Sequence, residues 1–341
     1  MISRMRILDG TLLALEAEGM RPTAARAAGW RRAVAGCGID SLETLLPPAG
    51  AGDSPDRASP VAESSSPPGN AASRRSAAPE RPPSLSELIA RVLPTTVVPS
   101  VSALANLASG AFPQSGWHCI YGLGDALFAD RKTLARSIDS LSEGREALLA
   151  PCFTNERGCA TALAVEWLLG GEDRAALVSF AGCGGLAALE EVLAALLVHG
   201  GLPAADLRGL PELTDRYRRM GGGPIPPAKA VIGEAIFSVE SGIHVDGLWK
   251  SPDLYELFPP EIVGRERRII MGKHSGKRAV LVKCGALGLP VTADLAERVL
   301  QKVKEESARR KTSLCDTDFI ALYSTCRAGK DEKEEGGRAV L

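Results

Sequence analysis

The chain has 341 residues, of which 45% are hydrophobic and 24% charged, ordinary values for globular protein with room for a barrel-sized domain and a smaller one. Its 40 Lys and Arg residues nearly balance its 41 Asp and Glu residues, and only 4% of residues are aromatic. The balanced charge argues against nucleic acid or an anionic membrane as a partner bound mainly by charge, and the few aromatic rings argue against an extensive base-stacking surface. The sequence also contains no apolar run near the roughly 20 residues that a membrane-spanning helix needs.

Two further features predict a soluble, cytoplasmic protein. The segment Met1–Gly10 lacks the apolar core and small-residue cleavage site of a signal peptide. The eight cysteines form no Cys-x-x-Cys pair and no finger-like spacing. A chain this long needs no disulfide staples, so we expect most of the thiols to be reduced and packed.

Predicted strands and helices alternate along the chain as far as residue 199. In chain order they are a strand at 5–8, a helix at 23–34, a strand at 41–46, a helix at 85–92, strands at 95–98 and 119–121, a helix at 132–141, a strand at 148–153, a helix at 159–169, a strand at 175–181 and a helix at 186–199. Alternation at this spacing is typical of βα units around a parallel sheet.

A stretch rich in Pro, Ser, Ala and Gly interrupts this alternation at 47–84. It has too little apolar area to offset the entropy of ordering, so we predict a disordered insert that separates the start of a barrel at 1–46 from its remainder at 85–220. Without the insert too few residues remain for an eightfold βα barrel, which takes roughly 250 residues. The predicted fold is therefore α/β, with a reduced or incomplete TIM-type (β/α) barrel that has room for six units.

The run Gly221-Gly-Gly-Pro-Ile-Pro-Pro227 predicts a domain boundary. Beyond it we expect small α+β C-terminal subdomains at 221–330, polar and loop-rich as far as Lys277, and a charged tail at 331–341.

Two helices are predicted inside this C-terminal region. Leu295, Val299 and Val303 share one face of a helix from 292 to about 309, and a short last helix is expected at 316–323.

Four motifs in the C-terminal region are distinctive. They read Pro224-Ile-Pro-Pro-x-Lys-Ala-Val-Ile-Gly-Glu234, Glu240-Ser-Gly-Ile-His-Val-Asp-Gly247, Pro259-Pro-Glu-Ile-Val-Gly-Arg-Glu-Arg-Arg268 and Gly272-Lys-His-Ser-Gly276. With these motifs the chain resembles the homocitrate synthase and isopropylmalate synthase family, most closely the nitrogenase-associated homocitrate synthases. The match runs almost continuously from Pro224 to about Leu322.

The resemblance implies a fold and an acyltransferase reaction connected with nitrogen fixation. Family members carry an eightfold βα barrel followed by small subdomains. They condense the methyl group of acetyl-CoA with a 2-oxo acid such as 2-oxoglutarate and then hydrolyse the thioester. A divalent metal polarises the carbonyl of the oxo acid, a base removes a methyl proton, and an acid protonates the alkoxide.

The same resemblance implies catalytic residues in the C-terminal region. His244 falls on the family's catalytic histidine and Tyr255 on its tyrosine, and we add Glu240 to this set. In the family these side chains reach over the barrel mouth of a neighbouring protomer. Without the resemblance, His244 would be interpreted as a packed loop histidine.

The barrel half departs from the family at its metal-binding positions. Where the family has Asp-Thr-Thr-Leu-Arg-Asp-Gly, this chain reads Asp9-Gly-Thr-Leu-Leu-Ala-Leu15, so that Leu13 replaces the substrate-binding Arg and Ala14 a metal ligand. Cys152 and Thr154 stand where the family has two ligand histidines. Leu186 replaces a ligand Asn. We therefore expect no metal at these four positions, although the family uses one.

Other interpretations of this half stay open. Cys152, Cys159 and Cys183 come from strand ends that would converge and could form a thiolate metal site, although glycine neighbours fit lost constraint equally well. Gly182-Cys-Gly-Gly185 could bind an anion before a helix. His118 and His199 are expected to be packed or surface histidines.

These observations lead to one prediction and two alternatives. The prediction is a homocitrate-synthase-like acyltransferase with acetyl-CoA as co-substrate, whose altered metal positions argue against activity of the chain alone. The first alternative is a non-catalytic subunit that lends its C-terminal subdomain to an intact synthase. The second is a decaying gene product without a stable role. The partners would be a second copy or an intact paralogue, and a small 2-oxo acid.

Overall fold

The structure, a computed structural model, describes residues 6–37, 39–41, 84–93, 95–98, 101–104, 115–143, 146–171, 174–200 and 205–336. The chain divides into two compact units. The N-terminal unit comprises Met1–Leu196, Gly201–Ala205 and Asp215–Gly223, and the C-terminal unit comprises Leu197–Gly200, Asp206–Thr214 and Pro224–Leu341. Within the described part of the chain, every helix is too short or too polar to cross a membrane.

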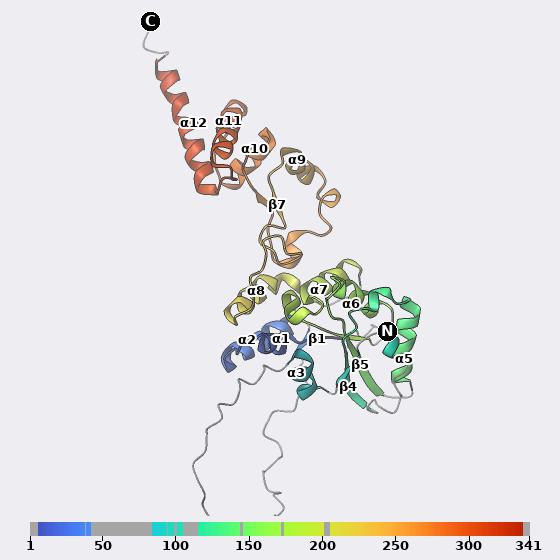
Figure 1. Ribbon diagram of the computed structural model, residues 1–341. Helices are drawn as coiled ribbons and strands as arrows, with labels where there is room; N and C mark the ends of the chain where they lie inside the picture. The colour runs from blue at the N-terminus through green and yellow to red at the C-terminus, as the bar shows by residue number, and fades with distance from the viewer. Residues whose placement is uncertain are drawn as a thin grey trace, which may run out of the picture. The chain divides into compact units, whose positions relative to one another are not determined.

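Six strands are described in the N-terminal unit (Figure 1). They are β1 (Arg6–Asp9), β2 (Asp40–Ser41), β3 (Thr95–Val97), β4 (Ser115–Tyr121), β5 (Glu146–Cys152) and β6 (Ala175–Val178). All the recorded pairings are parallel: β1 pairs with β2 and β6, and β4 pairs with β3 and β5. The first strand, β1, thus neighbours the last, β6, and β6 also lies beside β5. The predicted α/β class with parallel strands is confirmed.

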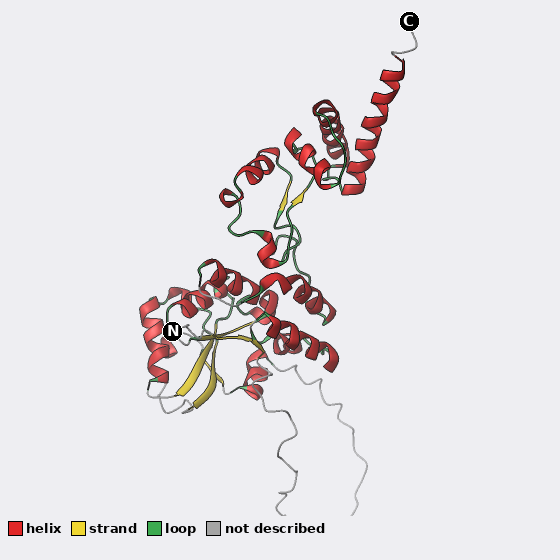
Figure 2. Ribbon diagram, turned by 180° about the vertical axis from the view of Figure 1, so that it is seen from behind, coloured by secondary structure: helices red, strands yellow, loops and turns green. Residues whose placement is uncertain are grey.

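Helices pack along these strands (Figure 2). They are α1 (Thr11–Ala17), α2 (Ala24–Gly36), α3 (Leu85–Val92), α4 (Val101–Leu104), the 3-10 turn η3 (Ala126–Phe128), α5 (Arg131–Ser142), α6 (Ala160–Leu169), the 3-10 segment η4 (Phe180–Gly185) and α7 (Leu189–Val198). The 3-10 turn η5 (Leu207–Gly209) belongs to the C-terminal unit, and the division between the units falls within α8 (Leu210–Arg219). Ser84 caps α3 in a capping box with Glu87, so the predicted insert at 47–84 loses its last residue to this helix. The rest of the insert lies outside the described residues.

Several predicted elements have different ends, and the helices α1, α4 and α8 were not predicted. The strand expected at 175–181 stops at Val178, because Ala181 has a left-handed backbone with φ 58°. The helix expected at 186–199 begins only at Leu189, because Leu186 forms a β-bridge with Thr154. Helix α1, directly after β1, was not predicted. Of the strand expected at 41–46, only Ser41 lies among the described residues, in β2.

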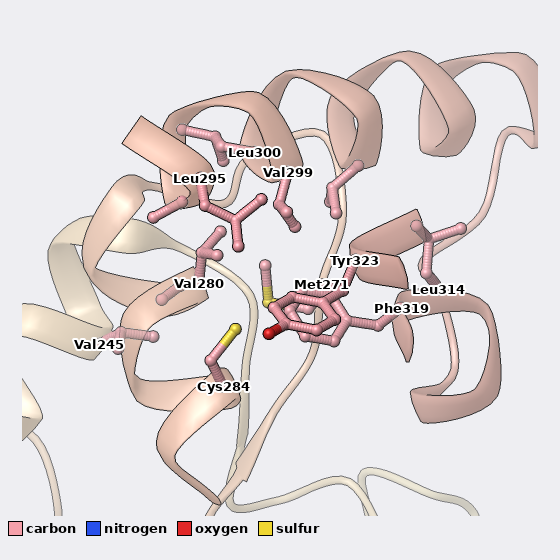
Figure 3. Close-up of a cluster of buried hydrophobic side chains, with 13 residues drawn as sticks. Val245, Met271, Val280, Cys284, Leu295, Val299, Leu300, Leu314, Phe319 and Tyr323 are labelled. Atoms are coloured by element: carbon pink, nitrogen blue, oxygen red, sulfur yellow. The ribbon is translucent and has the colours of Figure 1, made fainter. Parts of the chain in front are cut away.

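The C-terminal unit combines a two-stranded parallel sheet with helices. Its elements are β7 (Ser238–Val239), α9 (Gly242–Lys250), the 3-10 turns η6 (Pro252–Leu254) and η7 (Pro260–Val263), β8 (Arg268–Ile269), α10 (Lys277–Ala286), α11 (Ala293–Arg310) and α12 (Asp316–Gly336). The core lies among α10, α11 and α12 (Figure 3), where Val299, Val303 and Phe319 are fully buried. Met271, in the loop after β8, also lies in this core.

The region as far as Lys277 is loop-rich, as predicted, but it contains the unpredicted helix α9, whose glycines at 242 and 247 lower its intrinsic helix propensity but give room for close packing. One prediction for this unit is wrong. The last helix does not stop at Tyr323 but continues to Gly336, through part of the segment expected to be a tail. The Glu and Lys residues of 330–335 are good helix formers, and no proline stops them.

Candidate functional site

His244 lies in the first turn of α9, where Ser241 is the N-cap residue. Its imidazole is exposed, and the ring of Tyr255 lies against it edge to face, with ring centroids 5.8 Å apart and an interplanar angle of 69°. The structure therefore brings together two of the three residues that the sequence placed in the catalytic set.

The position of the Tyr255 ring depends on a glycine in helix α9. Tyr255 follows η6, and its backbone N–H donates a hydrogen bond to the carbonyl of Pro252 at 2.8 Å. A Cβ at Gly247 would overlap the tyrosine ring, so this glycine lets the ring lie against α9. Sequence analysis missed the support that Gly247 gives to Tyr255, because the contact depends on how the chain turns after α9.

A hollow of about 360 Å³ opens beside the two rings. It is lined by Ile236, Phe237, Val239, His244, Leu248, Tyr255, Glu256, Leu257 and Phe258. Arg267 binds the carboxylate of Glu256 through two nitrogens, at 2.8 Å and 2.6 Å, and this hydrogen bonding raises the pKa of the guanidinium. The hollow thus combines apolar walls, a neutralised carboxylate, and an imidazole and a phenol that can exchange protons with a bound molecule.

Glu240 is not part of this hollow. Its carboxylate accepts hydrogen bonds from the backbone N–H of His274 at 3.2 Å and from the Ser313 hydroxyl at 3.0 Å. It therefore contacts the Gly272–Gly276 loop and the turn before α12 rather than the imidazole of His244.

Large apolar side chains stand in solvent around His244. Ile243 is 79% exposed, Leu254 80% and Leu257 81%. These three exposed side chains lie within 15 residues of the sequence, on both sides of Tyr255.

The four positions aligned with family metal ligands lie inside the N-terminal unit. Ala14, Cys152 and Leu186 are at most 1% exposed and Thr154 is 5% exposed. The side chains of Ala14 and Leu186 have no donor atom, and the hydroxyl of Thr154 donates to Glu156 at 2.6 Å. Burial, followed by a hydrogen bond with Cys119, raises the pKa of the Cys152 thiol, so it stays protonated. These residues do not fit a divalent metal.

A buried carboxylate at the end of β1 binds donors of the chain itself. Asp9 is fully buried and accepts hydrogen bonds from the indole N–H of Trp30 at 2.7 Å and from the backbone N–H and hydroxyl of Thr11. The Thr11 oxygen in turn accepts the backbone N–H of Phe180 at 2.8 Å. Sequence analysis missed this network, since nothing in the spacing of Asp9 and Trp30 indicates a contact.

The three cysteines considered for a thiolate site have separate surroundings. Cys152 is hydrogen-bonded with Cys119, and Cys159 lines a hollow of about 290 Å³ beside α5 and α6. Burial, then the nearby Glu18 carboxylate, raises the pKa of Cys183 to about 12. In the residues that the structure describes, no three His, Cys, Asp or Glu side chains gather closely enough to hold a metal.

The glycine-rich loop before α7 holds a carboxylate of this chain. The backbone N–H of Gly184 donates to Glu18 at 2.9 Å, so that group takes the place that an anion would occupy. Of the two histidines expected to be packed or on the surface, one is buried and the other exposed. His118 shares a hydrogen bond with the Thr96 hydroxyl at 2.9 Å and burial lowers its pKa, while His199 is exposed.

Comparison with known proteins gives a family match and several relatives. Residues 231–311 match the family described as "Homocitrate synthase post-HMGL domain-like". The (R)-citramalate synthase of Methanocaldococcus jannaschii is 38% identical over 172 residues, 49% of this chain and 35% of that protein. The homocitrate synthase omega subunit of Clostridium pasteurianum is 34% identical over 187 residues, 54% of this chain and 53% of that protein. Homocitrate synthase 1 of a Nostoc species is 36% identical over 176 residues, 51% of this chain and 47% of that protein.

The matched stretch spans about a third to a half of the length of these relatives. The resemblance that the motifs indicated is confirmed: the chain is a partial relative of the homocitrate, citramalate and 2-isopropylmalate synthases, and residues 231–311 are similar to the homocitrate synthase post-HMGL domain.

Proposed function

We propose that this chain serves an acetyl-CoA-dependent condensation with a 2-oxo acid, as a subunit that supplies its C-terminal unit to a synthase with an intact barrel. The contrast between the two units carries the proposal. The metal positions of the N-terminal unit are buried and poor in donors, whereas His244 and Tyr255 stand exposed beside an open hollow.

The exposed pair suits proton transfer at a reacting centre on another polypeptide. The reaction needs one proton removed from the acetyl methyl group and one delivered to the alkoxide that forms from the ketone. An imidazole can act as a proton acceptor or donor, and the hydroxyl of Tyr255 lies on the ring beside that of His244. Catalysis by these groups requires the substrates to be held by the partner's barrel.

Two observations support an arrangement of more than one polypeptide. A relative that aligns with about half of this chain is named as a subunit of homocitrate synthase, so that enzyme is assembled from more than one kind of chain. The exposed Ile243, Leu254 and Leu257 provide an apolar surface next to His244, which a barrel mouth would cover.

We further propose that the N-terminal unit is a reduced βα barrel, assembled from 1–46 and 85–220, with the C-terminal subdomains at 221–330. The placement of β1 between β2 and β6 supports this, because a barrel brings its first and last strands together.

The test is rescue of a disabled synthase. The chain is co-expressed with a homocitrate or isopropylmalate synthase whose own catalytic histidine is replaced by Ala, and the purified complex is assayed for CoA release that depends on added 2-oxo acid. We expect turnover at least about 10²-fold above that of the disabled synthase alone, the usual contribution of a positioned acid or base. His244→Ala in this chain should abolish the rescue.

The exposed His199 provides a matched control, since His199→Ala changes the same residue type away from the hollow and should leave the rescue intact. Absence of a complex on co-purification, or rescue that is indifferent to His244→Ala, would contradict the proposal. Turnover by this chain alone would contradict it as well, and would favour a self-sufficient homodimer. The substrate class is then read from which 2-oxo acid supports turnover.

A further inference from the structure

Glu240 joins three segments of the C-terminal unit. Its Oε1 accepts the backbone N–H of His274 at 3.2 Å, and its Oε2 accepts the hydroxyl of Ser313 at 3.0 Å. Ser313 is far along the chain, in the turn between α11 and α12. Both carboxylate oxygens therefore bind donors of the chain itself, and Glu240 does not line the hollow beside His244.

Further hydrogen bonds join the start of α9 and residue 240 to the 272–276 loop. The backbone N–H of Gly242, the first residue of α9, donates to the carbonyl of His274 at 3.3 Å. The hydroxyl of Ser275, which is buried, donates to the carbonyl of Glu240 at 3.4 Å and accepts the N–H of Gly272 at 2.9 Å. The start of α9 is thus fixed to the 272–276 loop from both sides.

Two glycines make this close fit sterically possible. A Cβ on Gly242 would lie 2.7 Å from the Cα of Gly276, so the loop backbone passes directly against the start of α9. A Cβ on Gly272 would overlap Oε1 of Glu240. The loop leaves room for the carboxylate only while residue 272 has no side chain.

We infer that Glu240 is a positioning residue. Its carboxylate holds the 272–276 loop, the loop holds the first turn of α9, and that turn carries His244. Through Ser313, the same carboxylate makes the turn before α12 part of this support. The inference rests on the proposed function and replaces the expectation that Glu240 takes part in proton transfer.

The variant Glu240→Gln separates the two roles. The amide oxygen can still accept the His274 N–H, and the amide NH2 can donate to the Ser313 oxygen, but an amide cannot act as a base. In the rescued complex we expect Glu240→Gln to retain turnover within about threefold of wild type, whereas Glu240→Ala lowers kcat about 10²-fold with little change in KM, the effect of a misplaced catalytic group.

Two variants disturb the same contacts without changing Glu240. Gly272→Ala should displace the carboxylate and reproduce the loss seen with Glu240→Ala, while the protein stays folded, because the overlap is with the end of a flexible side chain. Ser313→Ala should have a smaller effect on kcat, and it should add nothing to Glu240→Ala, since both remove the same hydrogen bond.

A second readout uses the full chain alone and does not depend on activity. Amide hydrogen exchange is measured at His274 and Gly242, whose N–H groups donate within this network. Glu240→Ala should speed exchange at His274 about fivefold or more, the equivalent of one net hydrogen bond, while Glu240→Gln should not.

The two readouts distinguish failure of the inference from failure of the proposed function. A wild-type complex without turnover contradicts the proposed function, and exchange in the chain alone still tests the positioning role. Glu240→Gln as inactive as Glu240→Ala, with exchange unchanged in both, would make Glu240 a catalytic acid or base and overturn the inference. Exchange at His274 that is unchanged in Glu240→Ala would overturn it too.

Discussion

The two units place their chemically informative positions in opposite surroundings. In the N-terminal unit the positions aligned with metal ligands are buried, and the buried carboxylates of Asp9 and Glu190 accept hydrogen bonds from the chain itself. In the C-terminal unit, His244 and Tyr255 face solvent and contribute little to a core. The comparison indicates that the positions aligned with metal ligands contribute to packing, so restoring ligand side chains there should lower the free energy of unfolding. Substitutions of His244 and Tyr255 should leave that free energy almost unchanged.

The strongest test of this contrast restores one lost ligand. Ala14→Asp should destabilise the N-terminal unit by about 3–5 kcal/mol, because a carboxylate would be buried without a compensating partner. Ala14 is fully buried, and Gly184 lies close to its side chain. The measurement is the free energy of unfolding from urea denaturation monitored by circular dichroism.

Ala25→Asp is the matched control, since Ala25 is exposed in the first turn of α2, where an acidic residue is tolerated or favoured. It should change the free energy of unfolding by less than about 0.5 kcal/mol. If both variants behave alike, the N-terminal unit has space or water at residue 14, and the contrast between the units fails.

A smaller loss is expected from Trp30→Phe. The substitution keeps most of the ring but removes the N–H that donates to Asp9 at 2.7 Å, so the cost should be about 2 kcal/mol, the value for a hydrogen bond to a charged group. The double variant Trp30→Phe with Asp9→Asn measures the coupling between the two side chains. If Trp30→Phe costs the same in the Asp9→Asn background as in the wild type, the charge-assisted hydrogen bond contributes nothing.

The units should also respond to opposite extremes of pH. Burial raises the pKa of Cys183 from 9.0 to about 12, so between these values the folded unit keeps a proton that the unfolded chain releases, and stability falls as pH rises. In the C-terminal unit, hydrogen bonds from Arg309 and Arg310 lower the pKa of Glu306 from 4.5 to about 2, so stability is lost as pH falls through that range. Brief proteolysis with mass spectrometry should find cuts that are absent at neutral pH and lie outside 47–84, first in the N-terminal unit at about pH 10.5 and first in the C-terminal unit at about pH 3.

The smallest effect on folding is expected at the exposed pair. His244→Ala and Tyr255→Phe should each change the free energy of unfolding by less than about 0.5 kcal/mol, because neither removes a buried contact. Thermal unfolding of the full chain is the measurement. A loss of more than about 1 kcal/mol in either variant would show that the rings support the fold, and the contrast between the units would have to be abandoned.

Local signals predicted most elements of the N-terminal unit. The helix at Leu85–Val92 was predicted with the correct ends, although its capping box of Ser84 and Glu87 was overlooked and Ser84 was assigned to the insert. The pairing of β1 with β6 was not predicted, because hydrophobic periodicity identifies a strand but not its neighbours. Helix α9 was missed for a related reason, since its glycines are explained only by the loop and ring that pack against them.

The catalytic roles of the site residues stay a prediction. The family resemblance selected His244 and Tyr255, and the structure places their rings side by side. Glu240 was added to the same catalytic set, but its carboxylate binds the His274 N–H and the Ser313 hydroxyl instead of lying beside the imidazole. Its actual partner Ser313 lies 73 residues away, at a separation over which the sequence carries no signal.

The exposed apolar segment near His244 has a consequence for how much of this protein a cell can maintain. Ile243, Leu254 and Leu257 offer chaperones and proteases the kind of surface that marks an unassembled chain. Copies without something to cover that surface are expected to be removed faster than covered copies. The abundance of the protein would then follow the abundance of the molecule that covers the segment. Removal of uncovered copies, rather than gene expression, would set the ratio of this protein to that molecule.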